Sequence, residues 1–224
     1  MLLEIPKVLD QDKLENIRKV LEHARFQDGR LSAGEVARRV KRNEELDQQS
    51  QQARYLDQLV VSSLAANASF RNGALPHRVS QPFFARYGPG MTYGDHIDDP
   101  VMGPAGQRFR TDLAVTVFLN EPDDYQGGEL VINTPFGQNT VKLKAGSAVM
   151  YPASSVHRVA EVTGGQRLVA VLWVQSMVRD PARRELLYEL SLAREALLAA
   201  GPEEATAVHV DHAYVNLVRM WSEV

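Results

Sequence analysis

Residues 167–175 read RLVAVLWVQ, a run of β-branched and aromatic residues that opens with an arginine. A short apolar run of this kind is typical of a buried strand. Five similar runs precede it, each bounded by Gly, Pro, Asn or Asp: VSQPFFARY (79–87), LAVTVFLN (113–120), GELVIN (128–133), NTVKLKA (139–145) and SAVMYP (147–152). Short strands with no helical segments between them indicate an antiparallel sandwich or barrel.

Helical patterns flank this β block on both sides. Residues 10–66 are mostly helical in pattern, and NGALP at 72–76 ends that section. A helical block followed by an all-β block is typical of an α+β chain. We therefore predict residues 1–77 as an N-terminal helical support and residues 78–177 as the β core.

The C-terminal segment carries its own helix signals. Asp180 and Pro181 are typical of an N-cap and a first helical position, and Gly201-Pro202 separates two helical runs. Residues 178–224 are too few to fold alone. We expect this helical extension to pack on the β core or on a second copy of the chain, which would make a homo-oligomer.

Composition limits the classes of protein and of site. The chain has 224 residues and no cysteine, so disulfides, iron–sulfur clusters and thiolate nucleophiles are excluded. The N-terminal MLLEIPKVLDQDK meets Glu4 and Pro6 too early for a signal peptide, and the apolar run at 168–174 is too short to span a bilayer. We predict a cytoplasmic protein with no membrane partner.

The charge pattern gives no sign of nucleic-acid binding. The formal net charge is −3, whereas affinity for polyanions depends on an excess of Lys and Arg. One basic cluster, Arg38, Arg39, Lys41 and Arg42, is followed at once by Glu44, Glu45 and Asp47. We interpret this cluster as the solvated face of a helix.

A His-x-Asp pattern occurs twice, as His96-x-Asp98 and as His209-x-Asp211. The second copy lies in a helical pattern, where residues two apart point about 200° away from each other and cannot converge on one ion. The first follows a β-type run and a glycine, and in extended chain residues i and i+2 share a face. His96 and Asp98 are therefore the candidate metal ligands.

A third ligand and an anion partner follow in the β block. A facial Fe(II) site needs a second histidine from a distant strand, and His157 comes directly after the run SAVMYP. Arg167 opens the next strand, ten residues further on. A basic residue inside an apolar strand is costly unless it meets an anion, and arginine pairs best with a carboxylate.

These residues together resemble the Fe(II)- and 2-oxoglutarate-dependent dioxygenases, which are built on a double-stranded β-helix, or jelly roll. The stretches FARYGPGMTYGDHIDDP (84–100), RTDLAVTVFLNEPDDYQGGELVI (110–132) and VHRVAEVTGGQRLVAVLWVQSMVRD (156–180) are similar to the prolyl-4-hydroxylase-like branch, and specifically to the bacterial PKHD-type hydroxylases. GRLSAGEVARRVKRNEEL (29–46) and the helical tail are similar as well, so the resemblance covers essentially the whole chain.

The resemblance implies roles for five residues. His96, Asp98 and His157 become the ligands of one Fe(II) per subunit, and Arg167 becomes the partner of the distal carboxylate of 2-oxoglutarate. Tyr87 corresponds to a tyrosine that lines the 2-oxoglutarate pocket in related hydroxylases. O2 is then the second cosubstrate, and ascorbate is a further expected ligand.

The resemblance also draws attention to three further positions. Relatives often place a hydroxyl beside the arginine; Phe118 lies roughly at that position and cannot supply one, whereas Thr116 on the same strand could. Trp173 is either a wall of the pocket or a core aromatic. The glycines Gly127 and Gly128 are interpreted as ordinary hairpin residues.

The expected reaction is hydroxylation coupled to decarboxylation of 2-oxoglutarate to succinate. The substrate stays open between a peptidyl residue and a small molecule, for which the family's link to iron acquisition implies a siderophore-related compound. Two other functions stay open from the residues alone. A cupin-like metalloenzyme accounts for the metal ligands but leaves Arg167 unexplained, and a small-anion binding module has no need of an open-sided metal site.

Overall fold

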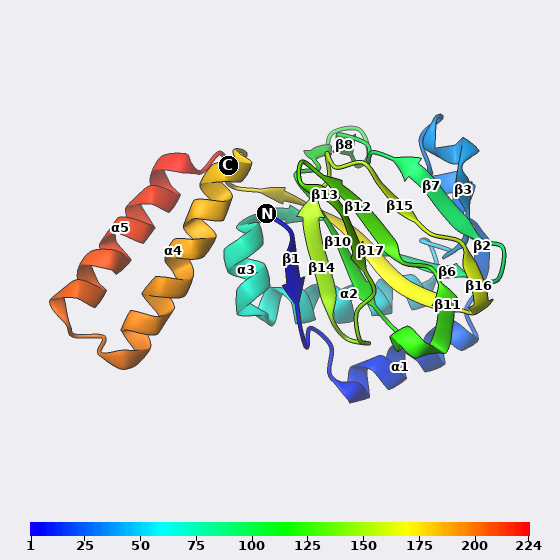
Figure 1. Ribbon diagram of the computed structural model, residues 1–224, viewed down its shortest axis with the longest axis horizontal. Helices are drawn as coiled ribbons and strands as arrows, with labels where there is room; N and C mark the ends of the chain where they lie inside the picture. The colour runs from blue at the N-terminus through cyan, green and yellow to red at the C-terminus, as the bar shows by residue number, and fades with distance from the viewer.

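The computed structural model describes residues 1–224, and its core is the run RLVAVLWVQ. This run forms β17 (Arg167–Ser176), which lies inside the larger of two antiparallel sheets. The first half of β17 pairs with β6 (Phe83–Tyr87), the second half pairs with β5 (Pro76–Val79), and the other edge pairs with β10 (Leu113–Phe118). Helices cover one face of this sheet and the second sheet covers the other, so β17 is apolar on both faces (Figure 1).

The two sheets have eight and five strands. The larger sheet runs in the order β1 (Leu3–Ile5), β14 (Ala148–Pro152), β10, β17, β6, β4 (Glu44–Leu46) and β2 (Phe26–Asp28), with β5 beside β17. The smaller sheet runs in the order β13 (Gly137–Val141), β12 (Leu130–Thr134), β15 (His157–Val159), β7 (Thr92–His96) and β3 (Lys41–Arg42). Two short ladders join β11 (Tyr125–Gly127) to β16 (Val162–Gly165) and β8 (Val101–Met102) to β9 (Phe109–Arg110).

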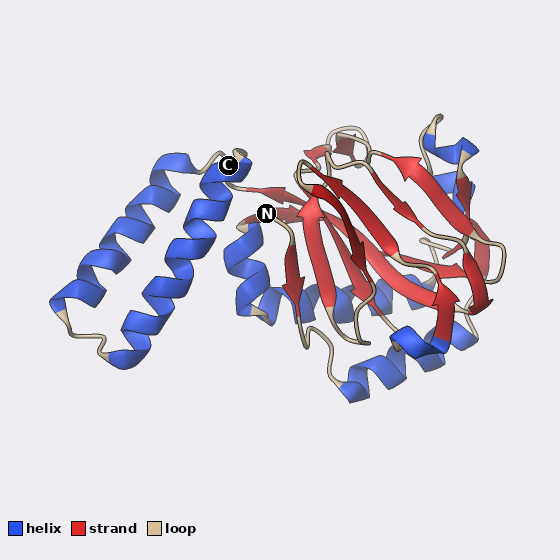
Figure 2. Cartoon of the chain, viewed as in Figure 1, coloured by secondary structure: helices blue, strands red, loops and turns tan.

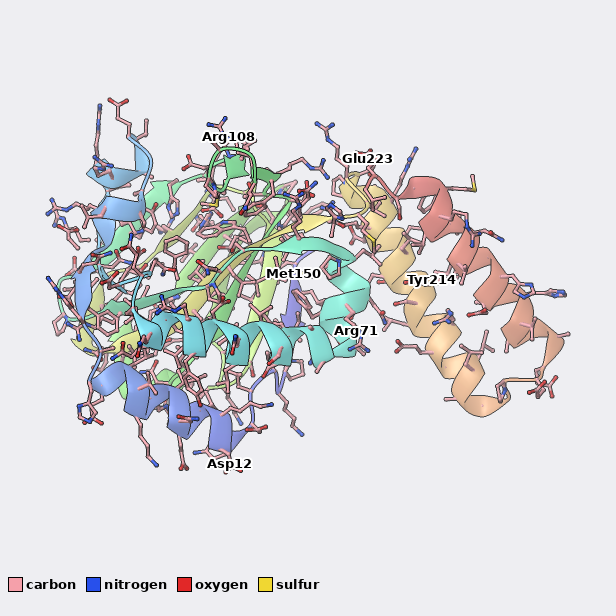
Figure 3. All side chains as sticks on the ribbon, turned by 180° about the vertical axis from the view of Figure 1, so that it is seen from behind. Asp12, Arg71, Arg108, Met150, Tyr214 and Glu223 are labelled. Carbon is pink, nitrogen blue, oxygen red and sulfur yellow. The ribbon has the colours of Figure 1, made fainter.

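Five helices lie outside the sheets, some along one face and two as a hairpin to one side (Figure 2). They are α1 (Gln11–Glu22), α2 (Gln51–Ala66), α3 (Ala68–Ala74), α4 (Pro181–Ala200) and α5 (Ala205–Trp221), and short 3-10 helices lie at Gly29–Ser32, Ala37–Arg39 and Pro122–Asp124. Helices α1 and α2 cross the outer face of the larger sheet (Figure 3). Their buried residues, such as Ile17 and Leu56, form one core cluster with Phe84, Val115 and Leu172 of the sheet. The predicted α+β jelly roll with helical additions at both ends is confirmed.

The C-terminal helices α4 and α5 form a hairpin that stands beside the barrel (Figure 1). The Asp180 side chain accepts hydrogen bonds from the backbone N–H groups of Ala182 and Arg183, and Pro181 is the first helical residue, as the sequence predicts. A small cluster of Leu75, Val178 and Leu187 attaches the hairpin to the barrel. No helix in the chain combines the length and the apolar character that crossing a membrane requires.

The N-terminal segment differs from its prediction, because it also supplies strands to both sheets. Strands β1, β2 and β4 extend the larger sheet, and β3 forms an edge of the smaller one. Each has only two or three residues, which is too short for an alternating pattern to show in the sequence. Strand β5 crosses the expected boundary at residue 77, and the three-part division of the chain stays a prediction.

The interpretation of the basic cluster as a solvated helix face is wrong for Lys41. Lys41 lies on β3 and is only 6% exposed, and its Nζ is 2.5 Å from Oε1 of Glu45, which is also 6% exposed. The alternation of the short strand turns Lys41 inward and leaves Arg42 exposed.

Candidate functional site

Three side chains from the smaller sheet meet at one point inside the barrel. His96 ends β7, Asp98 lies two residues beyond it, and His157 begins β15 directly opposite His96 in the β7–β15 ladder. Oδ1 of Asp98 is 3.9 Å from Nε2 of His96 and 3.7 Å from Nε2 of His157. The three ligand atoms all lie within 4.8 Å of one another. This spacing suits a single metal ion bound by two imidazoles and one carboxylate.

Hydrogen bonds fix the orientation of both imidazoles. Nδ1 of His96 lies 2.8 Å from the Gly94 carbonyl oxygen, and Nδ1 of His157 lies 3.0 Å from that of Ser155. A carbonyl oxygen only accepts, so Nδ1 carries the proton in each ring and donates it. The lone pair of each Nε2 is then directed to the common point, as in histidines that bind metals.

Burial also sets the protonation of these groups. Burial, reinforced by the neighbouring His157, lowers the pKa of His96 to about 3, so His96 is neutral as a ligand must be. Burial raises the pKa of Asp98, and its Oδ2 has no hydrogen-bond partner. A bound cation would restore the carboxylate form of Asp98. The donor set therefore fits a divalent metal.

Arg167 lies in the same cavity and lacks a partner. Its side chain comes from the start of β17 and is 1% exposed, yet Nε and Nη1 make no hydrogen bond. The rings of Tyr87 and Phe118 lie 5.0 and 5.8 Å from its Cζ. A buried guanidinium without an anion is costly. The free donors of Arg167 therefore fit an anion such as a carboxylate.

Tyr87 and Tyr125 flank this guanidinium. Tyr87 faces Arg167 across the β6–β17 ladder, and burial raises the pKa of Tyr87 to about 12, which keeps its hydroxyl protonated. The sequence gives no role to Tyr125. Burial raises the pKa of Tyr125 while the nearby charge of Arg167 lowers it, and its buried hydroxyl has no partner. Thr116 lines the cavity as well.

Gly128 has a structural role that an ordinary hairpin glycine lacks. Its φ of +68° is in the left-handed region. A Cβ at this position would stand 3.0 Å from the ring of Tyr125 and 3.1 Å from Cδ of Arg167. Gly128 therefore makes room for both side chains.

The cavity that holds these groups has a volume of about 800 Å³, including its open mouth. Trp173 has both of the roles that the sequence left open. It belongs to the core cluster between the sheets, and it also lines this cavity. Residues of the N-terminal segment line it too, among them Lys41, Asn43 and Glu45. Sequence reasoning missed these three, although they alternate in the way that inward-facing strand residues do.

The neighbouring acidic residues and the second His-x-Asp lie elsewhere. Asp95 is exposed and pairs with Arg158 at 3.4 Å, whereas the side chain of Asp99 reaches the cavity mouth. Asp211 on α5 accepts a hydrogen bond from Arg194 on α4. The triad is the one group of such residues in the chain with metal-binding spacing.

Known proteins of similar sequence cover the whole chain. Residues 82–175 match the family model of the 2OG-Fe(II) oxygenase superfamily, and residues 181–223 match that of the PKHD-type hydroxylase C-terminal domain. A PKHD-type hydroxylase of Thioalkalivibrio sulfidiphilus is 56% identical, and one of a Caulobacter species is 45% identical, each over the full length of both chains.

A solved structure shares the fold. It is a prolyl hydroxylase from Trichoplax adhaerens in complex with a peptide of hypoxia inducible factor, 17% identical with a TM-score of 0.59. The match covers 85% of this chain and 86% of that one. Full-length similarity at 56% identity favours a dioxygenase over a cupin-like metalloenzyme or a binding module. The chain belongs to the PKHD-type hydroxylase family, and it is a dioxygenase that uses Fe(II) and 2-oxoglutarate.

Proposed function

We propose that His96, Asp98 and His157 bind the Fe(II), that Arg167 binds the distal carboxylate of 2-oxoglutarate, and that the enzyme hydroxylates a peptidyl residue or a small molecule, with a siderophore-related compound as the leading small-molecule candidate. One observation carries the assignment. A buried guanidinium with two free donors lies in the same cavity as three convergent metal-ligating atoms.

The chain's own residues bind, orient and shield the reactants. His96, Asp98 and His157 would hold the ion from one side, which would leave its other side open to the cavity. Arg167 fixes the direction of the dicarboxylate, and Tyr87 and the hydroxyl of Tyr125 stand beside it. When bound, Fe(II) and 2-oxoglutarate supply oxidative chemistry in which decarboxylation to succinate is coupled to hydroxylation. The buried side chains of Tyr87 and Trp173, with the half-buried ring of Tyr93, limit the access of water to that chemistry.

A visible spectrum tests the assignment. Chelation of 2-oxoglutarate to Fe(II) under anaerobic conditions should give a metal-to-ligand charge-transfer band. We expect His157→Ala to abolish the band. Tyr125→Phe should raise the 2-oxoglutarate concentration needed for half of the band by about 10-fold, the value of one hydrogen bond to a charged group. Metal binding without a band at saturating 2-oxoglutarate would contradict the proposal.

We also propose that the α4–α5 hairpin contacts a second copy of the chain. Several large apolar side chains of the hairpin are exposed: Leu186, Leu192, Val215 and Met220. Light scattering after size-exclusion chromatography would give the mass, and a monomer at all concentrations would contradict the proposal. Ascorbate binding and a cytoplasmic location stay predictions.

A further inference from the structure

Residues 41–46 form a polar wall on one side of the cavity. Lys41 on β3 pairs with Tyr93 of the smaller sheet, and Glu45 on β4 pairs with Ala85 of the larger sheet, so this segment crosses from one sheet to the other. In extended chain, residues 41, 43 and 45 share a face. Lys41, Asn43 and Glu45 are each 5–6% exposed and line the cavity that holds the triad.

Two of the three polar side chains, Lys41 and Glu45, form an ion pair with each other. Lys41 Nζ lies 2.5 Å from Oε1 of Glu45 and donates to Oγ of Ser32 at 2.9 Å. Their charges cancel, so the wall has no net charge with which to select an ion. A buried pair of this kind adds little to stability, because desolvation offsets the attraction between the charges. Its effect is to hold the segment in one conformation.

The side chain of Asn43, between the two, makes no hydrogen bond, although the Tyr87 hydroxyl lies near it. Neither Nδ2 nor Oδ1 makes a hydrogen bond, although both atoms are buried. The side chain lies against Gly29, where a Cβ would stand 1.9 Å from Oδ1. An unpartnered buried amide is costly, so a group that satisfies it gains affinity. Exchanging the nitrogen and oxygen of Asn43 changes nothing in this reasoning, because one donor and one acceptor remain.

The chemistry of Asn43 selects its partner. A carboxylate only accepts and an ammonium only donates, so each would leave one atom of Asn43 unsatisfied. A secondary amide offers a carbonyl to Nδ2 and an N–H to Oδ1. The distal carboxylate of 2-oxoglutarate already has two free donors on Arg167, so it has no need of Asn43.

We infer that Asn43 is a specificity-determining residue that binds a secondary amide group of the substrate, with the Lys41–Glu45 pair as its support. The inference rests on the proposed function only in that the amide belongs to the molecule that is hydroxylated. Peptides carry this group, as do amide-linked small molecules. The Asn43 subsite therefore narrows the substrate class to amide-bearing compounds.

A pair of matched probes tests the Asn43 subsite. The probes are N-methylhexanamide and methyl hexanoate, which differ only in that an ester oxygen replaces the single amide N–H. Binding is followed by the change in tryptophan fluorescence in protein loaded anaerobically with Fe(II) and 2-oxoglutarate. Trp173 lines the cavity, whereas Trp221, at the end of α5, contributes a constant background. For a probe of about ten non-hydrogen atoms we expect a Kd in the millimolar range. The ester should bind about 10-fold more weakly.

Two variants separate the donor from the acceptor of Asn43. Asn43→Ala should remove the preference for the amide. Asn43→Asp should weaken the binding of both probes, because the carbonyl loses its donor, and should keep the preference for the N–H. Arg42→Ala, at the neighbouring exposed residue that ends β3, is the matched control and should behave as the wild type.

Three results would overturn the inference. They are equal binding of amide and ester to the wild type, no binding of the amide in the millimolar range, and a raised 2-oxoglutarate requirement in Asn43→Ala, which would assign Asn43 to the cosubstrate. The thermal midpoint of Asn43→Ala adds a further check, because a structural role would lower it whereas an unpartnered amide has no bond to lose.

The Asn43 subsite and the proposed function can fail independently. Absence of the charge-transfer band in the wild type would contradict the proposed function alone. The same probe titration in metal-free protein would then still decide whether Asn43 binds an amide. A band with no preference for the amide would contradict the subsite alone.

Discussion

The tripeptide His-x-Asp occurs in two regions of this molecule with different results. In the barrel, His96 and Asp98 follow extended backbone, and their ligand atoms converge with that of His157. In the hairpin, His209 and Asp211 lie within α5, and Asp211 pairs with Arg194 of the neighbouring helix. The residues and their spacing are the same, so the backbone conformation alone decides which copy has metal-site geometry.

The two regions also differ in how completely their polar groups are paired. Every buried side-chain atom without a hydrogen-bond partner belongs to the barrel: Asn43, Asp98, Tyr125, Arg167 and Trp173. In the hairpin, buried Arg184 donates to the backbone carbonyls of Val178 and Arg179. Unpaired buried groups cost stability, and all of these residues except Tyr125 line one cavity, which indicates that ligands complete their hydrogen bonds.

The largest expected effect separates the two copies of the tripeptide. His96→Ala should weaken Fe(II) binding by more than about 100-fold, beyond the loss seen when a residue that only supports a ligand is removed. His209→Ala should leave Fe(II) affinity unchanged. Anaerobic competition with a chromogenic chelator measures both. A comparable loss of Fe(II) affinity in the two variants would contradict the conclusion that only the barrel copy of His-x-Asp binds metal.

The next effect concerns the unpaired cation of the barrel. Arg167→Met should raise the 2-oxoglutarate concentration for half of the charge-transfer band by about 100-fold, since two hydrogen bonds to a charged group are lost. The metal-free variant should be at least as stable as the wild type, because an unpartnered buried charge is removed. A lower melting temperature would show that Arg167 has a structural partner. Arg158→Met, on the outer surface, is the control.

Detaching the hairpin tests whether the two regions are independent. Leu187 is fully buried where α4 meets the barrel, so Leu187→Ala should cost about 2–5 kcal/mol of unfolding free energy. Urea denaturation measures the cost, and Leu31→Ala, at an exposed leucine outside the hairpin, is the control. The charge-transfer band should survive at temperatures where the variant is folded. Its loss would mean that the hairpin supports the metal site.

The smallest effect is expected at the ion pair of the hairpin. The side chains of Arg194 and Asp211 are 28% and 29% exposed, and pairs open to solvent contribute less than about 1 kcal/mol. Asp211→Asn should therefore lower the urea midpoint only slightly. Hydrogen exchange of α5 would register the change, with no effect on Fe(II) affinity. A loss of several kcal/mol would mean that this pair is shielded from water.

The sequence indicated the barrel and the triad because their signals are local. β-Branched runs bounded by turns predict strands, and the i, i+2 spacing of His96 and Asp98 reports a shared face. Strands β1 to β4 were not predicted, because a strand of two or three residues is too short to show an alternation of apolar and polar side chains. The sequence did not predict a role in the site for Tyr125, Asn43 and Glu45 for another reason. Their environment is created by chain segments distant in sequence, and no local pattern distinguishes a buried asparagine from a surface one.

The pairing of His96 with His157 in the β7–β15 ladder has a consequence for folding. Side chains alternate along a strand, so a slip of one residue in this ladder would send one histidine to the outer face. Only the native register brings both imidazoles to Asp98. An ion that binds this arrangement stabilises it by mass action over the slipped alternatives. A supply of iron during refolding would then raise the yield of molecules in which β7 and β15 have the native register, before any turnover takes place.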